Sequence, residues 1–216
     1  MISITIWVIA ALEFILFLLM GKNYFGDKKP FLLCVALITF GLFFDAFGIS
    51  LGTIMKPGKL FSIMSKFRFI FHGLLIPLLF PICAYALKFK KKGMIITWAV
   101  TGLLMAGGLA EALATDLELV ELAGVNRMSS ASTTPKWATM ISLGLSFGTV
   151  IPLMISGIIA WIKQKKPSLF LAGFLMFIFA AIAPAVGHPE LTFFITMFGE
   201  LFMVFFLFIY SKKAED

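Results

Sequence analysis

Charged residues are scarce in this chain. Only 13% of its 216 residues are Asp, Glu, Lys or Arg, whereas 61% are hydrophobic. A soluble domain of this length needs more polar surface than that, so the composition excludes a soluble enzyme or binding module. The mean hydropathy of +1.04 indicates that lipid is the surrounding solvent.

Cysteine and histidine are also rare, with two of each. Cys34 and Cys83 lie in separate apolar segments without a CxxC or CxxH companion, which excludes a disulfide framework and a thiolate zinc site. No Gly-rich phosphate-binding loop occurs, which excludes nucleotide chemistry. Basic and aromatic residues do not combine into an RNA- or DNA-binding face, so we expect no nucleic-acid partner.

Long apolar stretches dominate the sequence instead. Runs of about 18 or more residues, long enough to cross a hydrocarbon core ~30 Å thick, recur seven times. We therefore expect an all-α, polytopic bundle of seven transmembrane helices that forms a single domain over residues 1–216. The helices are predicted at residues 2–21, 31–54, 67–88, 93–115, 137–162, 168–185 and 190–211.

The distribution of basic residues predicts the orientation of the bundle. With the N-terminus outside, twelve of the eighteen Lys and Arg residues fall in cytoplasmic segments. The positive-inside rule then predicts an outer N-terminus and a cytoplasmic C-terminus. We expect a multi-pass integral protein of a cell membrane, in contact with membrane lipids.

The longest connection, residues 116–136, begins with acidic residues at helical spacing. Asp116, Glu118 and Glu121 predict a prolongation of the fourth helix, with Gly124 as its C-cap. A polar loop follows, in which Thr134-Pro135 predicts the N-cap and first residue of the fifth helix.

Several ionisable side chains lie within the predicted spans, where such groups are costly and mark a site, a pathway or a buried pair. At ~1.5 Å per residue, Asp45, Glu200 and Glu13 lie at a similar depth, roughly 13–17 Å below the outer ends of their helices. We predict an outward-facing polar cavity that binds substrate. Its predicted lining is Asp45, His72, Glu111 and Glu200, with Glu13 as a further candidate. The structural alternative is a protonated or hydrogen-bonded acid that ties two helices together.

Small residues accompany the carboxylate of the second helix. Gly41, Gly48 and Gly52 share one face with Asp45 at helical spacing. Because glycine lets neighbouring helices approach closely, we expect Asp45 to lie in a seam between helices, away from lipid.

Two further positions have structural interpretations. Arg68, one turn before His72, is expected to reach the lipid headgroups or to pair with Glu111. His188 precedes Pro189 at the start of the last helix, where it is expected to act as a cap.

The leading functional hypothesis is binding or translocation of a small molecule, or of protons. Acids at mid-depth are the components that such a pathway needs, and Ser and Thr side chains supply neutral hydrogen bonds. The molecule expected from the acids is cationic or amphiphilic.

The alternative is an intramembrane lipid hydrolase, for which Asp45, His72 and Glu200 are the catalytic candidates. His72, His188, Asp45 and Glu200 could form a set of N and O ligands for zinc, with Glu111 as general base. Seven-helix hydrolases of the ceramidase and adiponectin-receptor type are superficially similar, but this chain has two histidines and no HxxxH pair.

A second resemblance covers helices two and three. The positions of Asp45, four residues after Gly41, and of His72 on the next helix resemble those in lysoplasmalogenases, which implies a lipid substrate. No second Asp motif stands in the sixth helix, where Ala180-Ala181 occurs. A further alternative is a non-catalytic subunit whose glycine faces dock onto a partner membrane protein.

Overall fold

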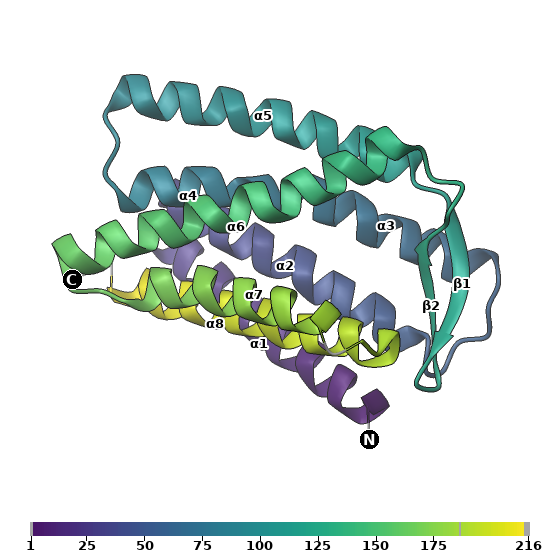
Figure 1. The fold of residues 1–216 in the computed structure, drawn as a ribbon. Helices are drawn as coiled ribbons and strands as arrows, with labels where there is room; N and C mark the ends of the chain where they lie inside the picture. Colours follow the sequence, from purple (N-terminus) through teal and green to yellow (C-terminus); the bar gives the residue numbers. More distant parts are fainter. Residues whose placement is uncertain (1, 186, 214–216) are drawn as a thin grey trace.

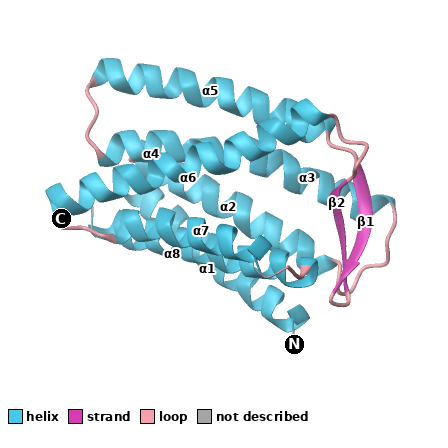
Figure 2. Ribbon diagram, viewed as in Figure 1, coloured by secondary structure: helices cyan, strands magenta, loops and turns pink. Residues whose placement is uncertain are grey.

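The computed structural model describes residues 2–185 and 187–213, and over this range it is a helical bundle with one β-hairpin (Figures 1 and 2). The prediction of an all-α, seven-helix membrane fold is confirmed. Six helices in the described range are long and apolar enough to cross a membrane, and α7 is a shorter apolar helix. The elements are α1 (Ile2–Asp27), α2 (Pro30–Leu51), α3 (Lys59–Leu75), η1 (Ile76–Leu78), α4 (Leu79–Ala86), α5 (Lys91–Ala114), β1 (Leu117–Leu122), β2 (Val125–Ser130), α6 (Lys136–Gln164), α7 (Ser168–Ala185) and α8 (Pro189–Lys213).

The third predicted helix consists of α3, η1 and α4, and it begins eight residues earlier than predicted, at Lys59. Pro77 lies in η1 and has no N–H to donate to the carbonyl one turn earlier. The backbone tightens there into a 3₁₀ turn before it continues as α4. Pro81 falls in the first turn of α4, where the missing N–H costs little.

The two ends of the bundle carry different elements. The N-terminus and the hairpin lie at one end, whereas the end of α8 lies at the other (Figure 1). An odd number of crossings requires this arrangement. Below, the two ends are called the hairpin end and the C-terminal end. Which of them faces the cytoplasm stays a prediction from the basic residues.

The helices pack around an apolar core that extends along α2. Its fully buried side chains include Ile38, Leu42, Ile82, Leu153 and Leu207, which come from four helical segments, α2, α4, α6 and α8. A second buried cluster, near the hairpin end, contains Ile6, Ile9, Ala46, Val125 and Met197. The hairpin is therefore packed onto the bundle through Val125.

The segment after α5 corrects the prediction of a longer fourth helix. Residues 117–130 form an antiparallel hairpin, with Leu117 opposite Ser130 and Leu122 opposite Val125. Ala123 and Gly124 make a two-residue turn with φ values of 53° and 75°, the left-handed conformation that tight hairpin turns require. Gly124 is thus a turn residue and not a helix C-cap.

The start of α6 also differs from the prediction. Pro135 is the residue that precedes the helix, and no side chain caps it. The hydroxyl of Thr134 instead accepts a hydrogen bond from the backbone N–H of Asp116 at 3.1 Å and another from the Ser130 hydroxyl at 3.0 Å. Thr134 therefore closes the base of the hairpin.

Candidate functional site

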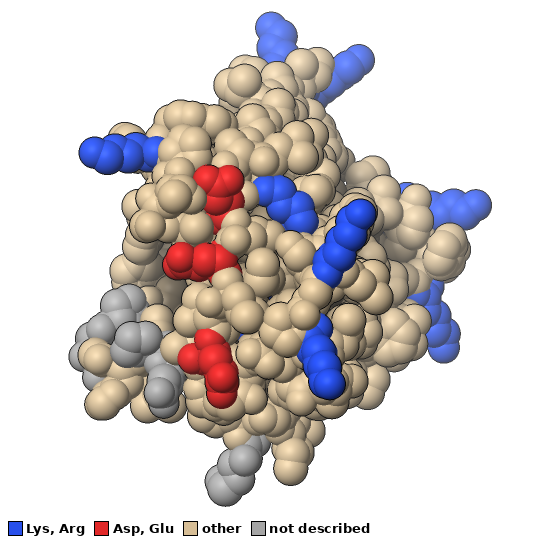
Figure 3. All heavy atoms as spheres, turned by 90° about the vertical axis from the view of Figure 1, so that its right-hand side faces the viewer, with Lys and Arg blue, Asp and Glu red and all other residues tan. Residues whose placement is uncertain are grey.

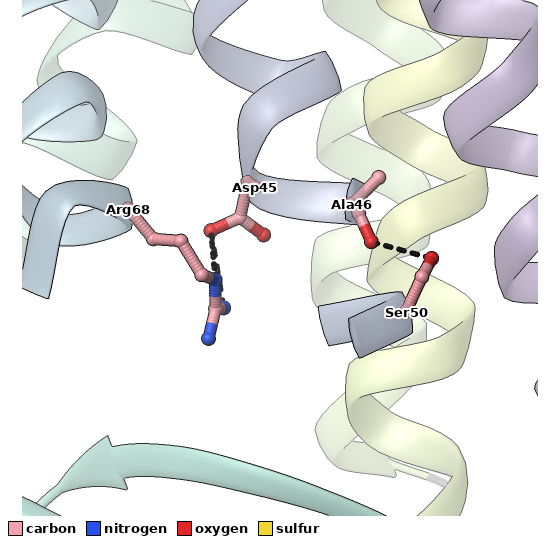
Figure 4. A network of polar contacts seen from close by, with 4 residues as sticks. All are labelled: Asp45, Ala46, Ser50 and Arg68. Carbon is pink, nitrogen blue, oxygen red and sulfur yellow. Dashed lines mark hydrogen bonds and ion pairs between the residues drawn. The ribbon is translucent and has the colours of Figure 1, made fainter. Parts of the chain in front are cut away.

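A buried ion pair joins α2 to α3 near the hairpin end (Figure 4). The Nε and Nη2 atoms of Arg68 both lie 3.1 Å from Oδ1 of Asp45, and the two side chains are 4% and 16% exposed. Oδ2 of Asp45 receives no hydrogen bond from the described residues. The expectation that Arg68 would reach the headgroups or pair with Glu111 is wrong, because Arg68 points inward to Asp45.

Glycine on α2 makes room for this pair. A Cβ atom on Gly48 would overlap Cδ of Arg68 and lie 2.8 Å from its Cγ. Gly41 lies in the same way against Leu75 of α3, and Gly52 against the backbone carbonyl of Asn126 in β2. The glycine face predicted on the second helix therefore faces α3 and the hairpin, with Asp45 in the seam.

The Asp45 carboxylate also lines a pocket of about 580 Å³ between α2, α8 and β2. We call this space the outer pocket. Asp45 and Ile49 form its α2 side, Arg127 comes from β2, and Thr192, Phe193, Thr196, Met197 and Glu200 come from α8, with Gly187 at the connection that precedes α8. Figure 3 looks onto the hairpin end, where acidic side chains form a column with basic side chains on both sides of it.

Arg127 is the residue of the outer pocket that sequence reasoning missed. Its guanidinium lies over the Phe193 ring, 5.0 Å from the centroid, and its Nε is buried without a hydrogen-bond partner among the described residues. Burial lowers the pKa of Arg127 to about 10. The positive charge of Arg68 adds to the lowering, whereas Asp45 and Glu200 oppose it. No pattern in the sequence distinguishes this arginine from an ordinary loop residue.

One face of α8 supplies the polar wall of the outer pocket. Thr192, Thr196 and Glu200 follow one another at intervals of four residues and so lie on one face of the helix. The two threonine hydroxyls donate to backbone carbonyls, that of Thr192 to Ala183 and that of Thr196 to Thr192, at 3.0 and 2.9 Å. Their lone pairs can still accept hydrogen bonds. The Glu200 carboxyl, 7% exposed, makes no hydrogen bond within the described residues.

A second, smaller space continues from Glu200 toward the middle of the bundle. This inner cavity, about 70 Å³, lies between α2, α3, α6, α7 and α8 and is mostly apolar. Its polar members are His72, Ser146, Thr149 and Glu200. His72 and Glu200 therefore line the same cavity, and His72 lies within electrostatic range of Asp45 and Arg68.

Glu13 of α1 lies behind these residues. It is fully buried, neither of its carboxyl oxygens has a hydrogen-bond partner among the described residues, and it lies within electrostatic range of Glu200 and Asp45. The structure thus brings together the three acids that the sequence places at a common depth, although Glu13 lines neither space.

Glu111 and His188 lie apart from this group. Glu111 on α5 accepts a hydrogen bond from the Thr115 hydroxyl at 3.2 Å and lines neither space. The His188 side chain is exposed at the start of α8. Its backbone carbonyl accepts from the N–H groups of Leu191 and Thr192 at 2.9 and 3.1 Å, so His188 caps that helix through its main chain.

These residues do not fit a zinc site. Within the part of the chain that the structure describes, no three His, Cys, Asp or Glu side chains are placed to hold a metal ion. His188 is at the surface whereas His72 lines the inner cavity, and Asp45 is engaged by Arg68.

Ser146 is the second residue that sequence reasoning missed. The pattern Gly144-x-Ser146-x-Gly148 matches the G-x-S-x-G motif of serine hydrolases and could have identified it. Here the motif lies within α6 and not on a strand-to-helix turn, and the Ser146 hydroxyl donates to the Ser142 carbonyl at 3.0 Å. Ser146 nevertheless lines the same inner cavity as His72.

Comparison with known proteins does not indicate a function, so the function is inferred from the chemistry of the site. No protein-family profile matches the chain, and no curated protein matches its sequence.

Proposed function

We propose that this membrane protein binds a small amphiphilic molecule with an anionic group in the outer pocket. The observation that carries the proposal is the difference between Arg127, which lines the outer pocket, and Arg68, which is paired with the pocket residue Asp45. Arg68 is neutralised by Asp45 at 3.1 Å, whereas Arg127 lines the pocket with no ion pair or hydrogen bond among the described residues. A guanidinium with free donors is suited to a carboxylate or phosphate oxygen.

The remaining polar groups favour a ligand that can also donate a hydrogen bond. Oδ2 of Asp45 and the lone pairs of Thr192 and Thr196 are acceptors that line the same pocket from α2 and α8. Glu200 can accept a hydrogen bond when ionised or donate one when protonated. A headgroup that bears an anion and a hydroxyl or amine would satisfy both sets of partners.

The lining changes from polar to apolar with depth, which supports an amphiphile. On α2 the lining residues run from Ile49 and Asp45 in the outer pocket to Leu42 in the inner cavity. On α8 the outer pocket ends at Glu200, and the inner cavity continues from Glu200 to Met203. The anionic group would meet Arg127, and the apolar part would extend past Glu200.

The inner cavity also reaches the outer surface of the bundle. Phe147 of α6 lines it and is 50% exposed, on a face that a bilayer would cover. A molecule dissolved in lipid could therefore leave or enter beside α6. This connection supports translocation between the bilayer and the hairpin end as the form that the function takes.

Binding can be tested with the full-length protein in an uncharged detergent. We expect decyl phosphate and decanoate to raise its melting temperature and decyltrimethylammonium to leave it unchanged. Arg127→Gln should weaken the binding of decyl phosphate by about ten- to a hundredfold, since a hydrogen bond to a charged group contributes about 1.5–3 kcal/mol. Lys136→Gln removes a positive charge at the same end that does not line the outer pocket, and should bind like wild type.

Two outcomes would contradict the proposal. Preferential binding of decyltrimethylammonium would show that the acids select the ligand, as the sequence alone suggests. Equal weakening by Arg127→Gln and Lys136→Gln would show that the net charge of this end matters and that the outer pocket does not.

An intramembrane lipid hydrolase is the second candidate, because His72, Ser146 and Glu200 line one cavity. Water would cleave an ester of the bound amphiphile to an acid and an alcohol, with Ser146 as nucleophile and His72 as base. Release of decanoate from a decanoyl ester that is lost in both Ser146→Ala and His72→Gln would support this activity. If the wild-type protein does not release decanoate from the ester, the hydrolase is excluded and binding is the function that is left.

A further inference from the structure

The C-terminal end of the bundle carries a hollow of a different kind from the outer pocket. It has a volume of about 500 Å³ and includes one lysine from each of three connections. These are Lys29 between α1 and α2, Lys88 after α4, and Lys166 before α7. We call this space the basic pocket. The three connections lie together at the left of Figure 1.

The charge of the basic pocket is uniform. No Asp or Glu is among its lining residues. Asp27 forms an ion pair with Lys29 at 2.9 Å, but the two side chains are about half exposed, so solvent screens the pair. Lys88 and Lys166 make no ion pair within the described residues. Lys88 and Lys166 therefore offer positive charge from two sides of the pocket to one anionic group, and Lys29 lies beside them with its Asp27 partner.

The polar floor of the basic pocket is fixed by hydrogen bonds between helices. Nε2 of Gln164 donates to the carbonyl of Ala86 at 2.7 Å, and the hydroxyl of Tyr210 donates to Oε1 of Gln164 at 3.1 Å. Tyr210 is almost completely buried, and its ring packs edge-on against Phe31. These contacts join α4, α6, α8 and α2, so the hollow is held open by the bundle itself.

A neighbouring hollow connects the basic pocket to the lipid-facing side of α6. It has a volume of about 390 Å³, shares Lys88 and Gln164 with the basic pocket, and adds Lys163, Phe89 and Ile159. On the same stretch of α6, Ile158 and Ile162 are exposed. If the lysines hold an anionic group, the apolar chains attached to that group would have an apolar exit along the surface of α6.

From these observations we infer that the basic pocket binds the phosphate group of an anionic phospholipid, whose acyl chains lie along α6. Lysines near a membrane surface attract anionic lipid, and basic pockets between helices at the cytoplasmic face hold such headgroups. The apolar exit favours a lipid over a free phosphate. The site is separate from the outer pocket, which lies at the opposite end of the bundle.

The inference can be tested by measuring lipid binding to the full-length protein in detergent by native mass spectrometry. The probes are dioctanoyl phosphatidylglycerol, dioctanoyl phosphatidylcholine and glycerol 3-phosphate. We expect phosphatidylglycerol to bind most tightly. The Lys88→Gln/Lys166→Gln double variant should bind it roughly 25-fold more weakly, about fivefold for each lysine.

Matched variants separate the basic pocket from a general effect of charge. Lys91→Gln/Lys92→Gln removes two exposed lysines from the same end that do not line the basic pocket, and it should bind phosphatidylglycerol like wild type. Lys88→Arg/Lys166→Arg should retain the binding, and it keeps the test valid if the Gln variant is unstable.

Three results would overturn the inference. They are equal binding of phosphatidylglycerol and phosphatidylcholine by the wild-type protein, equal weakening by the two double Gln variants, and binding of glycerol 3-phosphate as tight as that of phosphatidylglycerol. The last would identify a site for a free phosphate.

Discussion

The substitution Gly48→Ala tests whether the glycine face of α2 exists to hold the buried ion pair. The added Cβ would overlap Cδ of Arg68 and lie 2.8 Å from its Cγ. Arg68 cannot swing away cheaply, because it is 3% exposed and its Nε and Nη2 are bound to Asp45. The methyl group must therefore displace a side chain that is fixed at its far end.

The magnitude follows from three opposing effects. Overpacking a core costs about 1–3 kcal/mol. Alanine in a helix gains about 0.5–1 kcal/mol over glycine. If Arg68 leaves Asp45, the broken buried pair costs about 3–5 kcal/mol. With the pair partly retained, we expect a net loss of about 2–4 kcal/mol, which corresponds to a fall in melting temperature of about 5–15 °C for a chain of this length.

Melting in detergent, followed by fluorescence-detected gel filtration, measures this fall. Gly102→Ala on α5 is the matched control, because a Cβ there meets nothing within 4 Å, and it should melt at the wild-type temperature or slightly above. In an Asp45→Asn/Arg68→Ala background the clash is absent, so adding Gly48→Ala should cost little. If Gly48→Ala melts like Gly102→Ala, the reasoning about the seam is refuted.

Three further predictions concern the same region. Arg68→Leu should destabilise the protein by about 3–5 kcal/mol in thermal melts, and Asp45→Asn/Arg68→Leu by clearly less, because the single change strands a buried charge; equal losses would contradict this. Gly52→Ala, whose Cβ would overlap the Asn126 carbonyl, should abolish the binding of decyl phosphate while circular dichroism shows unchanged helix, since the hairpin would undock. With a pKa of about 10, Arg127 keeps its charge between pH 7 and 9 and loses it as the pH rises through 10. In a Glu200→Gln background, which removes the other pocket carboxyl that has no ion pair, decyl phosphate affinity should therefore be level up to pH 9 and fall above pH 10, and a decline that begins near pH 7 would point to another group.

The sequence was sufficient for the parts of the fold that depend on one helix at a time. Apolar runs identified the seven helices of the bundle, six of which are long and apolar enough to cross a membrane, because spanning length depends on local composition alone. Helical periodicity identified the glycine face around Asp45, and depth along each helix placed Glu13, Asp45 and Glu200 at one level. Each of these inferences needs the position of a residue along its own helix and nothing about its neighbours.

The parts that failed depend on which elements lie side by side. The sequence predicts that Arg68 reaches the headgroups or pairs with Glu111, because both residues lie near the outer ends of their helices, but the pairing with Asp45 depends on the room that Gly48 leaves between α2 and α3. Asp116, Glu118 and Glu121 predict a helical extension in place of the hairpin because they also fit a helical spacing. Packing of Val125 in the bundle favours the strand.

The hairpin also explains why Arg127 could not be found from the sequence. In a strand, alternate side chains face the same side, so Val125 and Arg127 point toward the bundle while Asn126, between them, uses its backbone N–H to bond the Gly52 carbonyl at 3.2 Å. A register shift of one residue would turn Arg127 away from the outer pocket. The position of Arg127 is therefore set by three features of the surrounding structure. They are the turn at Ala123-Gly124, the fit of Gly52 against Asn126, and the burial of Val125 against the bundle. The charge that selects the proposed ligand is held by the one non-helical element of the described chain, and its placement depends on tertiary packing that no linear pattern encodes.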